Sequence, residues 1–290
     1  MTKLNALFIG NCQNSGIIDL LNKHKKFSDT YTIKSHANWQ LLNGTINTPI
    51  MDLRNADLFI YQPLKDVYGC YSTNPTSPNS IVHLLKPDCI KISYPYIYNS
   101  AMWPICQTAY RKNRWFGWEP IHKLLKNNLQ TKDVLHLYET NQIDWEYNRR
   151  YEETTNIYKE KESHTDIKLF SYLENNLKHR LLYLIPQHPT SCVFYELANQ
   201  ILQKLNMKRL EDVVIENDNE SGLPDSTYER KDNMFPIHES TIDHFGLTFG
   251  HKYMFDAKEF YRQRILDYIS MNGVNCPDNY KAEDLKYDHH

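Results

Sequence analysis

The sequence predicts an α/β fold in which helices cover both faces of a parallel sheet and so form three layers. Four short apolar runs have the length and composition of buried strands, and each of them ends in polar residues. Helical patterns separate most of these runs, and such alternation is typical of a parallel sheet. The predicted strands are residues 4–9, 56–61, 89–93 and 180–185, with a weaker run at 30–34, and the predicted helices are residues 16–23, 80–85 and 191–205.

Polar residues at the ends of these strands are expected to meet. Right-handed crossovers place the carboxyl ends of parallel strands at one edge of the sheet, where open α/β folds bind their ligands. Proline follows the last three runs at Pro63, Pro95 and Pro189, as expected where a strand ends and a turn begins. Residues that are distant in sequence therefore form one candidate site at this edge.

A middle segment, residues 110–178, differs from the rest of the chain. It has few β-branched runs, and its leucine and aromatic residues have the spacing of amphipathic helices. We interpret it as a helical insertion into an α/β core domain of residues 1–109 and 179–270, with a further helix between 237 and 269 and a loosely ordered tail at 271–290. The alternative is that these helices belong to one compact domain.

Composition limits the class of protein. The chain has 290 residues, 41% of them hydrophobic, and a formal net charge of -2. This size suits one large domain with an insertion or two modest domains, and the apolar fraction is sufficient for a buried core. Without a basic field, the chain is not expected to bind nucleic acid. The expected partners are small molecules, and a homo-oligomer is compatible with the sequence.

The six cysteines are too far apart in sequence to form a CxxC pair. The apolar stretch after Lys3 is too short for the core of a signal peptide, and no run reaches the roughly 20 apolar residues of a membrane helix. We therefore expect a cytoplasmic protein with reduced thiols and no membrane span.

The most informative motif is Gly10-Asn11-Cys12-Gln13, a turn between the first predicted strand and the first predicted helix. A thiol at this turn faces the positive end of a helix dipole, which favours the thiolate. As a nucleophile, Cys12 would attack an acyl carbon while backbone N–H groups, with the side chains of Asn11 or Gln13, hold the oxyanion. The alternative is a cysteine packed under the helix, since free cysteine is among the most buried residues.

His188 is the candidate base. It follows the fourth predicted strand and precedes Pro189, so its imidazole is expected at the same edge as Cys12. A Cys–His pair is the simplest general-base arrangement for acyl transfer. The alternative is a histidine that hydrogen-bonds the backbone in a turn.

Amides and phenols at the ends of the other predicted strands can orient a sugar hydroxyl or an acyl carbonyl. The alternative is ordinary turn polarity, which is the better explanation for each residue taken alone. These residues are Gln62, Tyr94 and Asn99.

Two further groups of residues have a functional and a structural interpretation. Guanidinium and indole groups close together can grip a nucleotide, although a solvated helix face with aromatic anchors explains them too. This group comprises Arg111, Lys112, Arg114, Trp115 and Trp118.

A His/Asp group near the carboxyl end matches no standard zinc spacing, so no metal is expected. Asp243 or His244 would instead be a third catalytic group. This group comprises His238, Asp243, His244, His251 and Asp256.

At several of these motifs the chain resembles the WcbI-type polysaccharide biosynthesis proteins. The resemblance covers the amino-terminal third of the chain and residues 180–270, and no motif in the middle segment matches. The motifs are Gly10-Asn11-Cys12-Gln13, residues 57–63, Ile92-Ser93-Tyr94-Pro95, Gln187-His188-Pro189-Thr190, Phe235-Pro236-Ile237 and His244-Phe245-Gly246-Leu247.

The resemblance implies a role in capsule or surface-glycan synthesis, with coenzyme A as ligand and acetyl transfer to a sugar hydroxyl as the reaction. It also implies a fold similar to that of the SGNH hydrolases, which is flavodoxin-like and has a nucleophilic serine at the equivalent turn. On this basis, Cys12 matches the motif cysteine, Asn11 and Gln13 are its neighbours, and His188 is the histidine of the His-Pro step. With the residues predicted above from their own chemistry, the candidate site comprises Cys12 and His188 for catalysis, Asn11, Gln13, Gln62 and Tyr94 for the oxyanion and substrate, and Gly10, Arg111, Arg114 and Trp115 for the coenzyme.

Three alternatives stay open at this point. Direct transfer from the thioester to a hydroxyl needs only a base and an oxyanion hole, and Cys12 would then shape the site rather than attack. The same site with water as acceptor would be an esterase, as in a deacetylase or thioesterase. A non-catalytic module that binds coenzyme A or a nucleotide within a glycan-assembly complex is the third alternative.

Overall fold

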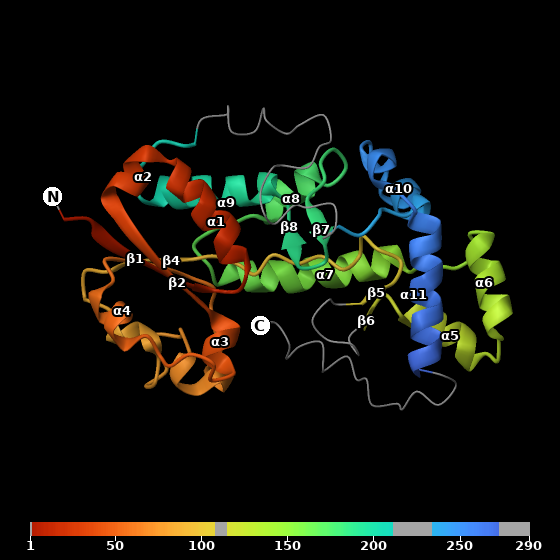
Figure 1. The fold of residues 1–290 in the computed structure, drawn as a ribbon, viewed down its shortest axis with the longest axis horizontal. Helices are drawn as coiled ribbons and strands as arrows, with labels where there is room; N and C mark the ends of the chain where they lie inside the picture. The colour runs from red at the N-terminus through yellow and green to blue at the C-terminus, as the bar shows by residue number, and fades with distance from the viewer. Residues whose placement is uncertain (1, 108–114, 211–233, 273–290) are drawn as a thin grey trace.

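The computed structural model describes residues 2–107, 115–210 and 234–272. Its largest sheet has four parallel strands in the order β2-β1-β3-β4 (Figure 1). The strands are β1 (Leu4–Gly10), β2 (Tyr31–Ala37), β3 (Leu58–Tyr61) and β4 (Ile90–Ser93). The predicted α/β fold with a parallel sheet is confirmed, and the weaker run at 30–34 belongs to a complete edge strand.

Helices cover both faces of this sheet because its central strands are apolar on both sides. One core cluster joins Phe8 and Ile60 to α1, α2 and α9, and a second cluster on the opposite face joins Leu7 and Phe59 to α3, α4 and the 3₁₀ helix η2. The predicted three layers are therefore present. These elements are α1 (Gln13–Lys23), α2 (Lys25–Thr30), α3 (Asn38–Leu42), α4 (Ile50–Asn55), η2 (Ile81–Leu84) and α9 (Ser191–Lys204).

The prediction that residues 180–185 form a further strand of this sheet is wrong. They contribute β7 (Tyr183–Ile185), which pairs antiparallel with β8 (His188–Pro189) in a separate hairpin. The outer edge of β4 is occupied instead by the segment at Asp166. The Ser93 backbone N–H donates to Asp166 Oδ2 (2.8 Å), and the Ser93 carbonyl accepts from the Asp166 N–H (3.1 Å). The backbone groups of Ser93 at this edge are therefore bonded by a segment that is not a strand.

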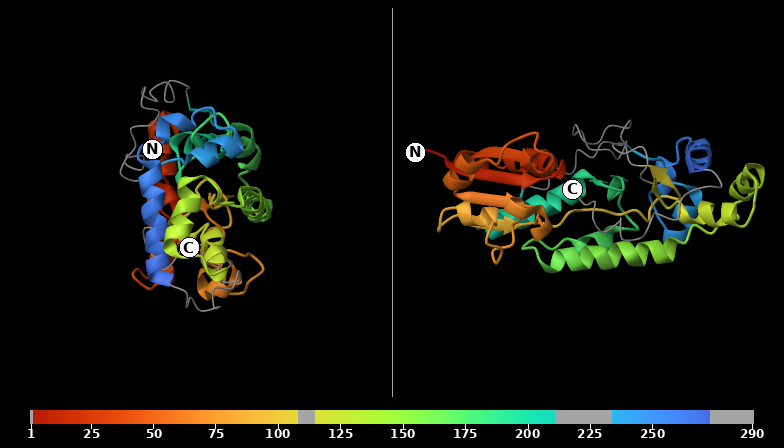
Figure 2. Two further views of the ribbon diagram at one scale, coloured as in Figure 1. Left: turned by 90° about the vertical axis from the view of Figure 1, so that its right-hand side faces the viewer. Right: turned by 90° about the horizontal axis from the view of Figure 1, so that it is seen from below.

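The remaining helices extend the molecule away from the sheet, and Figure 2 shows the resulting elongated shape. The long helix α7 runs between the two ends, and α11 packs against α6 and β5 (Figure 1). Helix α11 thus lies beside α6, and α10 lies at the same end of the molecule (Figure 1). The elements are η1 (Asp66–Tyr71), β5 (Cys106–Gln107), β6 (Trp115–Phe116), α5 (Glu119–Lys126), α6 (Thr131–Glu139), α7 (Tyr147–Ser163), α8 (Phe170–Asn176), α10 (Glu239–Phe245), η5 (Gly250–Tyr253) and α11 (Ala257–Asn272).

The predicted helix at 237–269 is two helices and a 3₁₀ turn. Gly246 ends α10 in the left-handed conformation, with a φ of 63°, which favours glycine. The chain then turns through η5 before α11 begins at Ala257.

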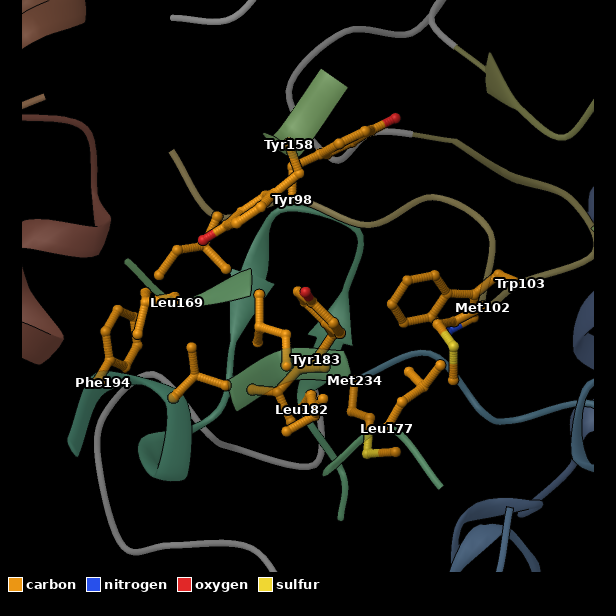
Figure 3. Close-up of a cluster of buried hydrophobic side chains, with 14 of the residues drawn as sticks. Tyr98, Met102, Trp103, Tyr158, Leu169, Leu177, Leu182, Tyr183, Phe194 and Met234 are labelled. Atoms are coloured by element: carbon orange, nitrogen blue, oxygen red, sulfur yellow. The ribbon is translucent and has the colours of Figure 1, made fainter. Parts of the chain in front are cut away.

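One continuous hydrophobic core joins the two ends of the molecule. At its centre, two leucines, Leu177 and Leu182, lie among large aromatic side chains (Figure 3). The aromatic residues are Tyr158 from α7, Tyr183 from β7 and Trp103 from the loop between β4 and β5. The helices between residues 115 and 178 share this core with α9 and α11, so no break in packing separates them from the rest of the described chain.

Among the described residues, no helix combines the length and apolar character needed to cross a membrane. The five cysteines described, Cys12, Cys70, Cys89, Cys106 and Cys192, are free thiols. The sixth, Cys276, and nearly all of the predicted tail at 271–290 lie outside the described residues.

Candidate active site

The turn after β1 lies at the topological switch point of the sheet. β2 lies on one side of β1 and β3 on the other, so the connections that leave β1 and β3 diverge at their carboxyl ends. Cys12 is the N-cap residue of α1 at this point and is partly buried. Its thiol is thus held at a helix N-terminus, where the dipole favours an anion.

The structure brings Cys12 and His188 together, with 3.8 Å between Cys12 Sγ and His188 Nε2. The route differs from the predicted one, because His188 lies in the β7–β8 hairpin rather than after a strand of the parallel sheet. Cys12 caps α1 and His188 shortly precedes α9, so the close packing of these two helices brings the two residues near each other. A Cβ atom on Gly16 would overlap the ring of Phe194, so the two helices approach as only glycine permits.

Burial decides the protonation state of the imidazole. It lowers the pKa of His188 below its ordinary value, because the charged form is poorly solvated there. The neutral imidazole therefore dominates at neutral pH, and a neutral ring nitrogen beside a thiol can accept a proton.

Three buried side-chain amides, which we call the amide cluster, lie beneath this pair: Asn11, Gln13 and Gln62. Gln62 Oε1 accepts from the Asn11 backbone N–H (2.8 Å), and Gln62 Nε2 donates to Gln13 Oε1 (3.2 Å). Gln13 also bonds the backbone of Ile97 and Gln187. The amides of Gln13 and Gln62, expected to contact substrate, are thus bonded to other parts of the protein.

Asn11 differs from the other two members of the amide cluster. Its Oδ1 accepts from the Gln13 backbone N–H (2.9 Å), which fixes the side chain over the first turn of α1. Among the described residues, no acceptor is within hydrogen-bonding distance of Asn11 Nδ2. Asn11 therefore keeps both Nδ2 hydrogens for a ligand, whereas Gln13 Nε2 donates in two bonds and Gln62 Nε2 in one.

Tyr94 and Gly10 also lie beneath the turn rather than over it. Tyr94 is fully buried, and its hydroxyl donates to Asn14 Oδ1 at 2.5 Å. A Cβ atom at position 10 would overlap both of these oxygens, so Gly10 makes room for their bond. Asn99, the third predicted orienting residue, uses Oδ1 to accept from the Ala101 N–H (2.8 Å).

The predicted nucleotide-binding group is only partly described. Arg111, Lys112 and Arg114 lie outside the described residues. Trp115 and Trp118 lie at the other end of the molecule, where both rings contact Tyr268 in α11. Trp115 is buried in β6.

The carboxyl-terminal His/Asp group is dispersed. His238 caps α10 through Ser240, and His244 pairs with Asn148 Oδ1 (3.0 Å). Within the ranges that the structure describes, no three His, Cys, Asp or Glu residues are placed to hold a metal ion.

Sequence reasoning missed three participants in this region. The backbones of Ile97 and Gln187 hold the side chain of Gln13, and no sequence pattern marks backbone partners. Asn38 follows β2, and the register of Gly10 with Ala37 puts it beside Asn11 at the same edge. Its buried Oδ1 has no hydrogen-bond partner among the described residues. The sequence signal for Asn38 was its place as a polar residue directly after the weaker predicted strand, which is β2 in the structure.

The fold and site define an α/β protein with a cysteine–histidine pair at the switch point of a parallel sheet. The family model described as "Polysaccharide biosynthesis enzyme WcbI" matches residues 5–210, and the chain belongs to this family. A solved structure of WcbI, described as a novel polysaccharide biosynthesis enzyme, aligns with a TM-score of 0.63 at 14% identity, over 94% of this chain and 96% of that chain. This similarity establishes the shared fold. Comparison with curated proteins gave no match. The likeness to SGNH hydrolases stays a prediction.

Proposed function

We propose that this protein transfers an acetyl group from coenzyme A to a sugar hydroxyl in polysaccharide biosynthesis. The observation that carries the proposal is the 3.8 Å contact between Cys12 Sγ and His188 Nε2 at the carboxyl edge of the sheet. Family membership supports the polysaccharide pathway. The solved WcbI structure is described as native protein without a disulfide bond between coenzyme A and one of its cysteines, which supports coenzyme A as the donor.

His188 acts as the base in this proposal. Its Nε2 takes the proton of the attacking group, the sugar hydroxyl or the Cys12 thiol, as that group bonds to the thioester carbonyl carbon. The carbonyl oxygen becomes an oxyanion, and Asn11 Nδ2 donates to it. The bond from carbon to the sulfur of coenzyme A then breaks, and His188 returns the proton to the departing thiolate.

If Cys12 attacks first, a second cycle completes the transfer. The sugar hydroxyl attacks the acetyl group on Cys12, His188 takes the hydroxyl proton, and the Cys12 sulfur leaves and recovers that proton. The thiol lies within reach of the imidazole and at a helix N-terminus, and both features suit this route.

The test combines ligand identification with transfer. Native mass spectrometry of freshly purified protein should detect bound coenzyme A. With acetyl-coenzyme A and a panel of monosaccharides and oligosaccharides, acetylated sugar should appear with free coenzyme A thiol. We expect Cys12→Ala and His188→Ala each to lower this rate by about 10²–10⁴-fold. Cys70→Ala, at an exposed cysteine, is the matched control and should leave the rate unchanged.

The other outcomes distinguish the covalent route, direct transfer, a hydrolase and a binding module. Unchanged transfer in both Cys12→Ala and His188→Ala would overturn the mechanism. An acetyl adduct on the Cys12 peptide supports the covalent route, whereas loss of activity in His188→Ala alone supports direct transfer. Release of acetate without a sugar would identify a hydrolase, and ligand binding without turnover would identify a binding module.

A further inference from the structure

We infer that Gln13 is a positioning residue that holds His188 opposite Cys12. The inference rests on the proposed function only in treating Cys12 and His188 as a reactive pair, and it assigns Gln13 a role other than stabilising an oxyanion. Gln13 is completely buried directly after Cys12 in the chain. Four hydrogen bonds to three segments of the protein carry the argument.

All of the hydrogen-bonding capacity of this amide is used. Gln13 Nε2 donates to the carbonyls of Ile97 (2.7 Å) and Gln187 (2.9 Å). Gln13 Oε1 accepts from the Ile97 N–H (3.2 Å) and from Gln62 Nε2 (3.2 Å). An amide has two donor hydrogens and two acceptor lone pairs, so no capacity remains for a substrate.

These bonds join the neighbours of the two reactive residues. Gln13 follows Cys12, and its partner Gln187 precedes His188. The β7–β8 hairpin is not part of the parallel sheet, so strand pairing does not fix it relative to β1. The bond from Gln13 to the Gln187 carbonyl supplies that link directly.

A second connection runs from Gln13 to the same hairpin through the loop after β4. Gln13 pairs with both backbone groups of Ile97, as an added strand residue would. Two residues later, the Asn99 N–H donates to the Pro186 carbonyl (2.9 Å). Consecutive carbonyls of the hairpin turn are therefore held from two sides, Gln187 by Gln13 and Pro186 by the loop that Gln13 bonds at Ile97. Loss of the Gln13 side chain removes the first of these bonds and loosens the loop that makes the second.

The test measures how His188 affects the reactivity of Cys12, without any acyl transfer. Iodoacetamide is the probe, and mass spectrometry of the Cys12 peptide separates it from the other cysteines. Gln13→Met removes the four bonds while keeping a side chain of similar length. Asn14→Leu is the matched control, because Asn14 is the next residue of α1, is equally buried, and bonds Tyr94 and Ser35 instead of the hairpin.

Both variants are measured with and without His188→Ala. We expect Gln13→Met to slow alkylation at pH 7 by about ten-fold with His188 present and by less than about two-fold in the His188→Ala background, because coupled residues are not additive. Asn14→Leu should have the same small effect in both backgrounds. An equal effect of Gln13→Met in both backgrounds, or none with His188 present, would overturn the inference.

A second variant and a second measurement guard against misfolding. Gln13→Glu keeps the acceptor bonds from Ile97 and Gln62 and loses both donors. Its negative charge acts on Cys12 with or without His188→Ala, so comparing these two backgrounds cancels that effect. NMR titration should show the pKa of His188 rising toward its ordinary value in the Gln13 variants, since a released ring is better solvated, and staying low in Asn14→Leu. An unmoved His188 titration in both Gln13 variants would contradict the inference. Failure of acetyl transfer with intact coupling would reject the proposed function alone.

Discussion

The two ends of the molecule bury polar side chains in different ways. At the carboxyl edge of the sheet, Gln13 and Gln62 bond other parts of the protein, whereas Asn11 Nδ2 has no acceptor among the described residues and Cys12 is partly exposed. At the other end of the molecule, the helical end formed by α5, α6, α10 and α11, Arg150 and His238 are buried and bonded to groups around them. Burial of a polar group therefore does not mark function by itself. What distinguishes the sheet edge is the Asn11 donor beside a partly exposed thiol that contacts an imidazole.

Asn11→Asp tests this distinction with the largest expected effect. The substitution keeps the acceptor for the Gln13 N–H and removes the two donor hydrogens of Nδ2. We expect kcat for transfer to fall by about 10²–10³-fold, as when one oxyanion donor is lost, with the folding free energy nearly unchanged. Transfer kinetics and urea unfolding measure the two effects.

The companion variant Asn11→Ala separates the two roles of this side chain. It loses the donor and also the acceptor over the first turn of α1, so about 1 kcal/mol of stability should be lost along with the rate. If Asn11→Asp keeps the full rate, Asn11 is structural like its neighbours, and the distinction between the two ends fails.

Arg150 provides the opposite test, because it is buried and should affect stability alone. Its guanidinium donates to the carbonyls of Ser100 (2.6 Å) and Pro104 (3.0 Å), which fastens α7 to the loop after β4. Arg150→Met leaves these buried carbonyls unsatisfied, and we expect a loss of about 3 kcal/mol in unfolding free energy. The preceding residue, Arg149, is the matched control.

Arg149 is much more exposed and pairs with Glu146 and Glu153 on the helix surface. Arg149→Met should cost about 0.5 kcal/mol, since exposed ion pairs contribute little. Chemical denaturation compares the two variants, and transfer activity per folded molecule should be the same in both. Equal stability losses would show that the bonds of the Arg150 guanidinium to the carbonyls of Ser100 and Pro104 do not stabilise the fold.

Local features of the sequence were sufficient to predict much of this arrangement. The run at residues 4–9 and the Gly10–Gln13 turn depend on near neighbours, so their strand, turn and helix could be predicted from pattern alone. His188 lies beside Cys12 as expected, but an apolar run does not reveal which strand it pairs with, and the β7–β8 hairpin was taken for a sheet strand. The bonding of Gln13 depends on the backbone of Ile97 and Gln187, which only the folded chain brings close.

The same limit applies at the helical end. The helical spacing in residues 110–178 predicted helices, but it does not specify which surfaces they cover. The packing of α11 against α6 arises from contacts between segments more than one hundred residues apart. Sequence pattern therefore predicts elements better than it predicts the surfaces they share.

His238 gives the smallest expected effect and tests whether a buried imidazole at the helical end only supports the fold. Its Nδ1 accepts from the Ser240 N–H (3.2 Å) as the cap of α10, and its ring contacts Tyr138 and Tyr261. Burial, with the charge of Lys258 as a smaller cause, lowers the pKa of His238 to about 4 from the ordinary 6.5. The unfolded chain therefore takes up a proton at higher pH than the folded protein does.

This difference predicts how stability depends on pH. The contribution of neutral His238 is fully present above pH 6.5 and is lost as the pH falls toward 4, with a total on the order of 2 kcal/mol. His238→Asn keeps a capping acceptor and does not titrate, so its unfolding free energy should fall less over this range. His244→Asn, at an exposed histidine of the same helix, should retain the wild-type slope. Urea unfolding between pH 4 and 7 compares the three proteins, and a wild-type slope in His238→Asn would mean that another group causes the acid sensitivity.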